Sequence, residues 1–163
     1  MGCGKSTVAD RLLKEYGMEI VEMDQELVDR VGMTIPEMFA KYGEEYFRDE
    51  ETKLLTECGK KSNVVVSCGG GAVLREQNVT IMKSSGLIVW LTANPQTILE
   101  RVGKDENRPL LKGNKNVSSI REMLEKRLPC YEKAADVRVE TDGRNVEDIC
   151  KEIIKKVKDE KAC

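Results

Sequence analysis

The first residues of the chain carry a pattern that binds phosphate groups. Residues 4–7 (Gly-Lys-Ser-Thr) precede a segment with helical spacing and match the second half of a Walker A loop. In such a loop, small residues let successive backbone N–H groups point at phosphate oxygens, and the N-terminus of the next helix favours negative charge. We expect Lys5 to reach the β- and γ-phosphates of a nucleotide and Ser6 to hold Mg²⁺.

The start of this loop pattern is absent. Its first glycine would lie two residues before Met1, and no apolar strand leads into the loop, although that strand is central in proteins of this class. We therefore expect the natural protein to begin upstream, with Met1 as an internal methionine of the loop. The stability and activity of the 163-residue form are then open. Residues 4–7 could also be a Gly-rich start without a ligand, so the downstream residues must decide.

Alternating strands and helices predict an α/β domain with a mainly parallel sheet. We see no internal repeat or domain boundary, so residues 1–163 are expected to form one domain with a mobile lid at the polar residues 103–116. Apolar runs predict strands at 19–23, 63–67, 87–91 and 137–140. Helices are predicted at 6–16, 25–31, from Thr34 towards Tyr42, and at 44–61, 76–84, 95–102, 118–131 and 146–158.

The composition excludes several classes of function. Lys and Arg total 27 against 29 Asp and Glu, so there is no overall charge to attract nucleic acid, and an anionic substrate needs locally placed Arg or Lys. No apolar run approaches the roughly 20 residues of a membrane span. The six cysteines form no Cys-x-x-Cys pair, and the chain has no histidine. We expect reduced thiols in a cytoplasmic protein whose proton transfer depends on carboxylates.

Six segments resemble the shikimate kinase family in order and spacing. They are residues 1–7 (MGCGKST), 22–24 (EMD), 43–51 (GEEYFRDEE), 67–73 (SCGGGAV), 108–111 (RPLL) and 126–131 (KRLPCY), with a weaker match at 144–145. The family phosphorylates the 3-hydroxyl of shikimate with ATP and Mg²⁺. The resemblance implies a three-layer P-loop kinase fold, with a mainly parallel sheet flanked by helices and its first, central strand missing from this chain.

The resemblance also implies a nucleotide site. Arg101 and Arg144 match positions that flank the adenine, and Arg108 opens the lid and would reach the phosphate being transferred. Ser6 and Glu22 would support the metal, although the family usually has Asp in place of Glu22. The remaining nucleotide ligands implied are Gly2, Cys3, Gly4, Lys5 and Thr7.

The same resemblance implies a substrate site. Asp24 would contact the attacking hydroxyl, while Arg48 and Arg127 would hold the shikimate carboxylate. The ring would lie against Gly69, Gly70 and Gly71. Lys5, Asp24 and Arg108 are thus the expected catalytic residues.

Physical chemistry independently favours these residue types. A rigid anionic polyol needs a guanidinium fork for its carboxylate and a carboxylate to accept hydrogen bonds from its hydroxyls. Asp24 follows a predicted strand, and ligands of open α/β sheets bind at the carboxyl ends of strands. Three consecutive glycines lose much backbone entropy on folding, so we expect them to let a substrate approach the backbone closely.

Each of these residues also has a plain structural interpretation. Arg48 lies on a charged helix and could be solvated, and Arg127 could form a surface ion pair with neighbouring charges. Asp24 could cap the helix that begins at Gln25. The three glycines could form only a tight turn, and Arg108 could be a surface charge of the lid.

Two rival functions stay open at this point. A kinase for another small polyol, such as gluconate, would use the same arginines but leave the Arg-Pro-Leu-Leu and Gly-Gly-Gly segments unexplained. A non-catalytic relative that keeps the fold would fit the incomplete loop but not the intact Lys5, Asp24 and Arg48. As partners we expect a small-molecule substrate, no nucleic acid and no membrane, and we expect a monomer.

Overall fold

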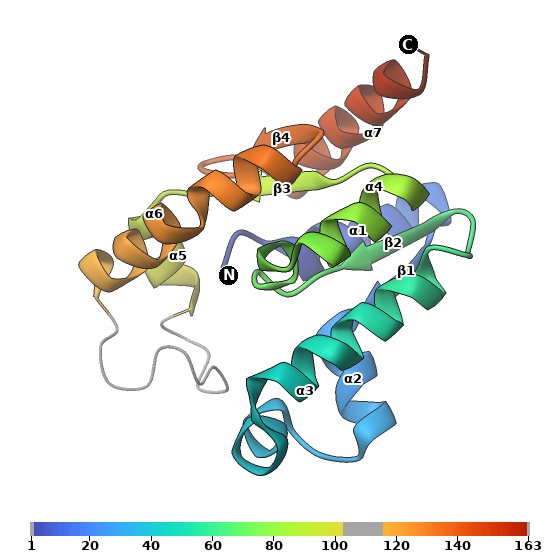
Figure 1. Ribbon diagram of the computed structural model, residues 1–163. Coiled ribbons are helices and arrows are strands. Elements are labelled where there is room, and N and C mark those ends of the chain that lie inside the picture. Colours follow the sequence, from blue (N-terminus) through green and yellow to red (C-terminus); the bar gives the residue numbers. More distant parts are fainter. Residues whose placement is uncertain (1, 103–115, 163) are drawn as a thin grey trace. The chain divides into compact units, whose positions relative to one another are not determined.

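The computed structural model describes residues 2–102 and 116–162 (Figure 1). They belong to two compact units, one within residues 1–8 and 87–163 and the other within residues 9–86. The predicted lid at 103–116 lies outside the described residues except for Asn116, whose side chain accepts a hydrogen bond from Ser119 N at 2.8 Å and caps the next helix. No helix in the described part of the chain is long and apolar enough to cross a membrane.

The unit of residues 9–86 contains a pair of parallel strands with helices packed on it. Helix α1 (Lys5–Tyr16) leads into it from the phosphate loop. Strand β1 (Glu19–Glu22) pairs with β2 (Val64–Ser67) so that Ile20 lies opposite Val65 and Glu22 opposite Ser67. The other elements are α2 (Met23–Val31), α3 (Ile35–Cys58), the 3₁₀ turn η1 (Ala72–Leu74) and α4 (Glu76–Ser85).

The unit that holds residues 87–163 repeats this arrangement with its own parallel pair. Its elements are β3 (Val89–Thr92), α5 (Pro95–Val102), α6 (Val117–Ala134), β4 (Val137–Glu140) and α7 (Val146–Ala162). Strand β3 pairs with β4 so that Trp90 lies opposite Arg138. Helix α7 packs on β4, and α5 packs on α6. The predicted α/β class with parallel strands is confirmed, and helix and strand bounds differ from the prediction by a few residues.

Strand register places the candidate site residues of the 9–86 unit at one edge of its strand pair. Because β1 and β2 run parallel and in register to Glu22 and Ser67, the segments that follow both strands emerge at the same edge. Asp24 follows the first strand, and Gly69–Gly71 follow the second. This is the carboxyl edge of the pair, where open α/β sheets bind ligands.

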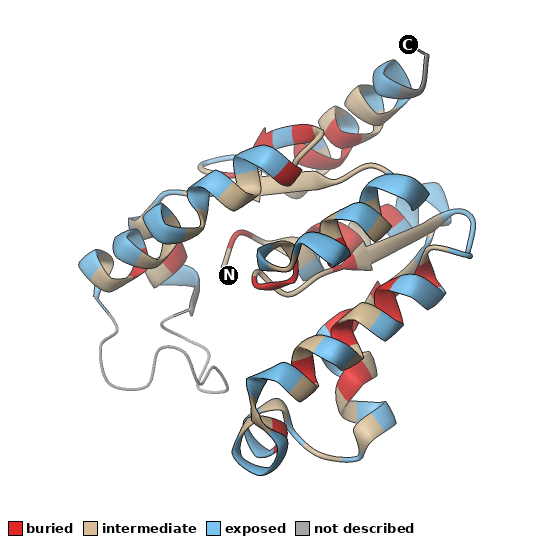
Figure 2. Ribbon diagram, viewed as in Figure 1, coloured by how far each residue is buried: buried red, intermediate tan, exposed pale blue. Residues whose placement is uncertain are grey.

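Apolar residues at helical spacing fix α3 in that unit. Its buried positions include Phe47, Leu54 and Leu55, which pack with Met23 and Leu27 of α2. Figure 2 shows buried positions along both of these helices. Burying side chains of this size stabilises a fold by about 1.5–3 kcal/mol each. The packed face therefore sets which way the opposite side chains of α3 point.

Both ends of the first part of α3 follow the predicted signals. Thr34 caps it, because its side chain accepts a hydrogen bond from Glu37 N while the Glu37 carboxylate accepts one from Thr34 N at 2.7 Å. Gly43 then kinks the helix with φ 82° and ψ 171°, a conformation that is essentially restricted to glycine. The predicted break at Gly43 is thus a kink inside one long helix.

This kink gives a test of the fold. We expect Gly43→Ala to lower the free energy of unfolding by about 1–3 kcal/mol, because a Cβ is strained at this φ and ψ. The matched control is Gly86→Ala, where φ is −174° and no atom lies within 4 Å of the added carbon. Urea unfolding of both variants measures the difference, and equal stability of the two would contradict the strained kink.

Candidate active site

The phosphate loop lies at the start of α1 in the unit with residues 87–163. Gly2 and Gly4 have positive φ values of 64° and 90°, and α1 begins directly at Lys5. The loop opens on a pocket of about 410 Å³. Its lining includes Gly2, Cys3, Gly4, Lys5, Ser6 and Thr7. The predicted loop residues are therefore brought together at a helix N-terminus, where backbone N–H groups favour an anion.

Two arginines predicted for the nucleotide site line this same pocket. Arg101 Nη1 donates to the carbonyl oxygen of Gly2 at 3.3 Å and to Thr141 Oγ1 at 3.1 Å, and its Nη2 donates to the Thr141 carbonyl oxygen at 3.1 Å. Arg144 lies on the same pocket wall. A helix N-terminus, Lys5 and two guanidinium groups form a strongly cationic surface that suits a triphosphate.

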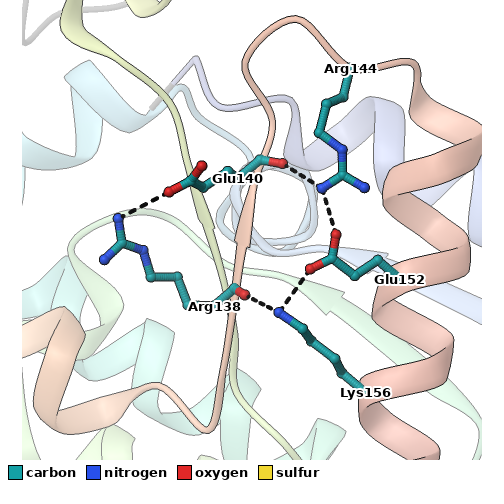
Figure 3. Close-up of a pocket in the computed structure, with 5 residues that line it drawn as sticks. All are labelled: Arg138, Glu140, Arg144, Glu152 and Lys156. Carbon is teal, nitrogen blue, oxygen red and sulfur yellow. Dashed lines mark hydrogen bonds and ion pairs between the residues drawn. The ribbon is translucent and has the colours of Figure 1, made fainter.

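Arg144 is held by a group of charges between β4 and α7 (Figure 3). Its Nη1 donates to the Glu140 carbonyl oxygen at 3.1 Å and to Glu152 at 2.5 Å. Lys156 donates to the Arg138 carbonyl oxygen and contacts Glu152, both at 2.8 Å. These contacts cover backbone carbonyls of β4 and lower the pKa of Glu152, through Lys156 first and Arg144 second. Arg138 and Lys156 are engaged in these contacts, so we assign no ligand to them, whereas Arg144 also lines the loop pocket.

The second part of the site surrounds the glycine turn of residues 9–86. A Cβ added to Gly69 would lie 3.2 Å from Asp24 Oδ1 and 3.4 Å from Glu51 Oε1. A Cβ added to Gly71 would lie only 2.6 Å and 2.7 Å from the two Nη atoms of Arg48. One guanidinium and two carboxylates therefore converge on this turn, and a Cβ at Gly71 would force the Arg48 guanidinium to move.

Arg48 and Glu51 form a buried ion pair beside this turn. Arg48 Nη1 donates to Glu51 Oε2 at 2.6 Å, and the side chains are only 16% and 1% exposed. Glu44 accepts a second bond from Arg48 Nη2 at 2.9 Å. Although burial alone would lower it, hydrogen bonding to Glu51 and Glu44 raises the pKa of Arg48. Arg48 is thus a fixed cation rather than the solvated side chain of the plain interpretation.

One oxygen of Glu51 lacks a protein partner. Oε1 is buried and accepts no hydrogen bond within the part of the chain that the structure describes. Burial raises the pKa of Glu51, against the opposing effect of Arg48, and nearby Asp24 raises it further. Sequence reasoning missed this residue because five of the eight residues 44–51 are acidic and together look like a solvated face. The one available signal was its spacing, one helical turn after Arg48.

Asp24 lies at the turn but does not cap a helix. The N-cap of α2 is Glu22, which makes no side-chain capping bond, and Asp24 stands in the first turn. The predicted capping role of Asp24 is therefore wrong, because β1 ends at Glu22 and the helix begins two residues earlier than Gln25. A carboxylate in the first turn is still favoured by the helix dipole.

Arg127 lies on α6 beside an aromatic pair. It hydrogen-bonds Tyr131, and burial raises the pKa of that tyrosine against the opposing effect of this bond. Tyr131 stacks on Trp90 with ring centroids 5.5 Å apart. Arg127 is half-buried, so its surroundings differ from the surface ion pair of the plain interpretation.

Gly70, Glu22 and Arg108 are the remaining predicted site residues. Gly70 lies within the glycine turn, and Glu22 lies at the end of β1. Arg108 lies outside the described residues. Thr141 was not predicted, yet it is 1% exposed and binds Arg101 in the pocket wall. Its position directly after β4 was the available signal.

A Gly-Lys-Ser-Thr loop that opens a helix, a cationic pocket beside it, and parallel strands with helices define a P-loop kinase. The family model described as shikimate kinase matches residues 1–158. The shikimate kinase of Thermodesulfovibrio yellowstonii is 39% identical over 155 residues, which cover 95% of this chain and 89% of that protein. The chain therefore belongs to the shikimate kinase family. Its members phosphorylate shikimate with ATP and Mg²⁺, and this chain is a phosphotransferase of that family.

Solved structures agree with this assignment. The shikimate kinase of Acinetobacter baumannii, solved in complex with shikimate, has a TM-score of 0.91 and 34% identity. That comparison covers 99% of this chain and 90% of the other. A gluconokinase from Sinorhizobium meliloti has a TM-score of 0.57 at 18% identity, covering 97% of this chain and 87% of that one. At that identity the likeness shows only a shared fold.

The buried Glu51 predicts an unusual pH dependence of stability. Because its pKa is raised in the fold, the folded chain holds a proton that the unfolded chain has lost above its ordinary pKa of about 4.3. The free energy of unfolding should therefore fall as the pH rises from that value through the raised pKa. We expect Glu51→Gln to remove this part of the pH dependence, as measured by urea unfolding from about pH 4 to 8.

An exposed glutamate on the same helix serves as the control. Arg30 lowers the pKa of Glu57, so this residue contributes stability that is lost as the pH falls. The difference in the free energy of unfolding between the native chain and Glu57→Gln should therefore grow as the pH rises, opposite to the change expected for Glu51→Gln. If the free energy of unfolding of Glu51→Gln changed with pH in the same way as that of the native chain, Glu51 would not carry a raised pKa.

Proposed function

We propose that this chain transfers the γ-phosphoryl group of ATP to the 3-hydroxyl of shikimate through the residues gathered at its two sites. The single observation that supports it best is the convergence of Asp24, Arg48 and Glu51 on the glycine turn. A guanidinium between carboxylates suits a ligand that carries both an anionic carboxylate and several hydroxyls.

Arg48 is the proposed ligand for the shikimate carboxylate. Its contact with Glu51 fixes the guanidinium and keeps it charged, so less side-chain entropy is lost when a carboxylate binds. Arg127 is the second proposed carboxylate ligand, on its match to the family segment at 126–131, and its bond with Tyr131 restrains it in the same way.

Asp24 and Glu51 are the proposed acceptors for the substrate hydroxyls. Asp24 Oδ1 and the unpaired Glu51 Oε1 both face Gly69, so hydroxyl groups bound there would satisfy a buried oxygen. In the transfer, Asp24 accepts the proton of the 3-hydroxyl while that oxygen bonds to the γ-phosphorus and the bond to ADP breaks. Phosphoryl transfer needs little covalent help, so Asp24 acts as a modest base.

The loop pocket is the proposed nucleotide site. Lys5 would contact the β- and γ-phosphates, and Arg101 and Arg144 would flank the adenine, with Arg108 as a proposed ligand of the transferring phosphate. Mg²⁺ keeps several of its waters and takes few protein ligands, so the Ser6 hydroxyl in this pocket, with Glu22 as indirect support, suits it. When bound, Mg²⁺ neutralises charge on the phosphates.

The proposed setting is a monomer in the cytoplasm that acts on a small molecule without nucleic acid or membrane. The near balance of 27 basic and 29 acidic residues supports the absence of a nucleic-acid partner. The five cysteines among the described residues form no disulfide, which suits a reducing compartment.

A coupled assay for ADP tests the function directly. We expect ADP formation to require shikimate, and Lys5→Ala to reduce turnover by at least about 100-fold, since it removes charge stabilisation of the transferred group. Arg127→Ala should raise the KM for shikimate by about 10-fold with a smaller effect on kcat, because it removes a carboxylate ligand.

The same assay separates the rival functions. Equal ATP turnover with and without shikimate would contradict the proposal, and equal turnover with gluconate would favour a kinase for other polyols. ATP binding without turnover on any polyol would favour a non-catalytic relative. A wild-type KM for Arg127→Ala would show that this arginine does not bind the carboxylate.

A further inference from the structure

A buried amide lies behind the glycine turn, outside every role assigned above. Asn78 on α4 has no exposed surface, although asparagine is usually exposed or placed at caps and turns. Its Nδ2 donates to the Ala72 carbonyl oxygen at 3.1 Å, and its Oδ1 accepts from Thr52 Oγ1 at 2.6 Å. Breaking either bond would leave a buried polar group unpaired, so the amide holds its two partners at a fixed separation.

The donor end of Asn78 holds the glycine turn. Ala72 directly follows Gly71, is fully buried, and donates its N–H to the Gly69 carbonyl oxygen at 3.1 Å. Leu74 N donates to the Gly71 carbonyl oxygen at 3.0 Å. The Ala72 residue thus closes the turn with its N–H, and its carbonyl oxygen is fixed by Asn78.

The acceptor end of Asn78 holds the helix that carries Arg48. Thr52 lies one turn after Arg48, and its Oγ1 is 2.9 Å from the Arg48 carbonyl oxygen. Arg75 strengthens this connection, because its Nη1 donates to Thr52 Oγ1 at 3.2 Å and to Asp49 Oδ1 at 2.7 Å. Contacts between α3 and the start of α4 therefore meet at the hydroxyl of Thr52.

Asn78 fixes the distance between α3 and the glycine turn. The position of the Arg48 guanidinium relative to that turn depends on this distance. That group lies so close to Gly71 that a single added carbon would be 2.6 Å from it. A shift of a few tenths of an ångström between α3 and the turn would change how the guanidinium meets a ligand. If Asn78 were only structural, it would stabilise the fold without affecting how the Arg48 guanidinium meets a ligand.

We propose that Asn78, acting through Thr52 and Ala72, is a positioning residue that sets the spacing between Arg48 and the glycine turn and so sets the affinity for the substrate carboxylate. This inference rests on the proposed function, in which Arg48 binds that carboxylate. Asn78 itself contacts neither substrate nor nucleotide in this account.

The test replaces Asn78 with leucine, which has a similar size but no amide. We expect Asn78→Leu to raise the KM for shikimate by about 10-fold, while the KM for ATP stays within about twofold and kcat falls less than the KM rises. Thr52→Val removes the hydroxyl with little change of shape and should raise the KM for shikimate in the same direction. Because both variants break one connection, the double variant should lose less than the product of the single losses.

Two control variants separate positioning from stability. Thr56→Val makes the same chemical change one turn further along α3, at an exposed hydroxyl that bonds only the Thr52 carbonyl oxygen in the described residues, and should leave both KM values unchanged. Cys58→Ala opens a cavity in the core of the same helix and should lower Tm while leaving the KM for shikimate unchanged. Circular dichroism melts of all variants provide the comparison.

The outcomes distinguish this inference from the proposed function. If Asn78→Leu and Thr52→Val lower Tm but keep the wild-type KM for shikimate, Asn78 is only structural and the inference is overturned. If Asn78→Leu does not fold, Thr52→Val alone decides. If Arg48→Ala leaves shikimate affinity unchanged, the carboxylate ligand is misassigned and the proposed function fails at that residue. If Arg48→Ala weakens it and both other variants do not, only the positioning role fails.

Discussion

The ion pair between Arg48 and Glu51 is the interaction on which the proposed substrate site depends. A glutamate side chain that is 1% exposed pays a large desolvation penalty, which Arg48 offsets only in part because Oε1 is unpaired in the described residues. Such a pair is weak evidence for stability. The surrounding fold must therefore hold it in place, and its presence fits the proposed binding of an anionic polyol better than a role in folding.

Several features of residues 9–86 are arranged around that pair. The buried face of α3, with Phe47 and Leu54, directs Arg48 and Glu51 towards the glycine turn. Glycine at position 71 leaves room for the guanidinium, and the parallel register of β1 and β2 brings Asp24 to the same edge. In the loop pocket of the other unit, a helix N-terminus, Lys5 and guanidinium groups supply positive charge for phosphates.

Features with local causes were predictable from the sequence. Periodicity predicted the helices and strands, Thr34 was expected at the start of a helix, and residues 4–7 were placed in a phosphate loop. Glu51 was missed because burial in a run of acidic residues is decided by tertiary packing. The glycine turn was expected to admit a substrate, whereas at Gly71 the group that needs the space is the protein's own Arg48. Local sequence cannot reveal which partner fills such a space.

Calorimetric binding of shikimate and of its methyl ester, which lacks the carboxylate charge, tests the central claim most directly. The native chain should bind the ester about 10- to 100-fold more weakly than shikimate, as expected for losing a charge-assisted hydrogen bond of roughly 1.5–3 kcal/mol. In Arg48→Met that preference should shrink severalfold, leaving only the part that Arg127 supplies. The same ester penalty in both proteins would contradict the account, because the carboxylate would then be recognised without Arg48.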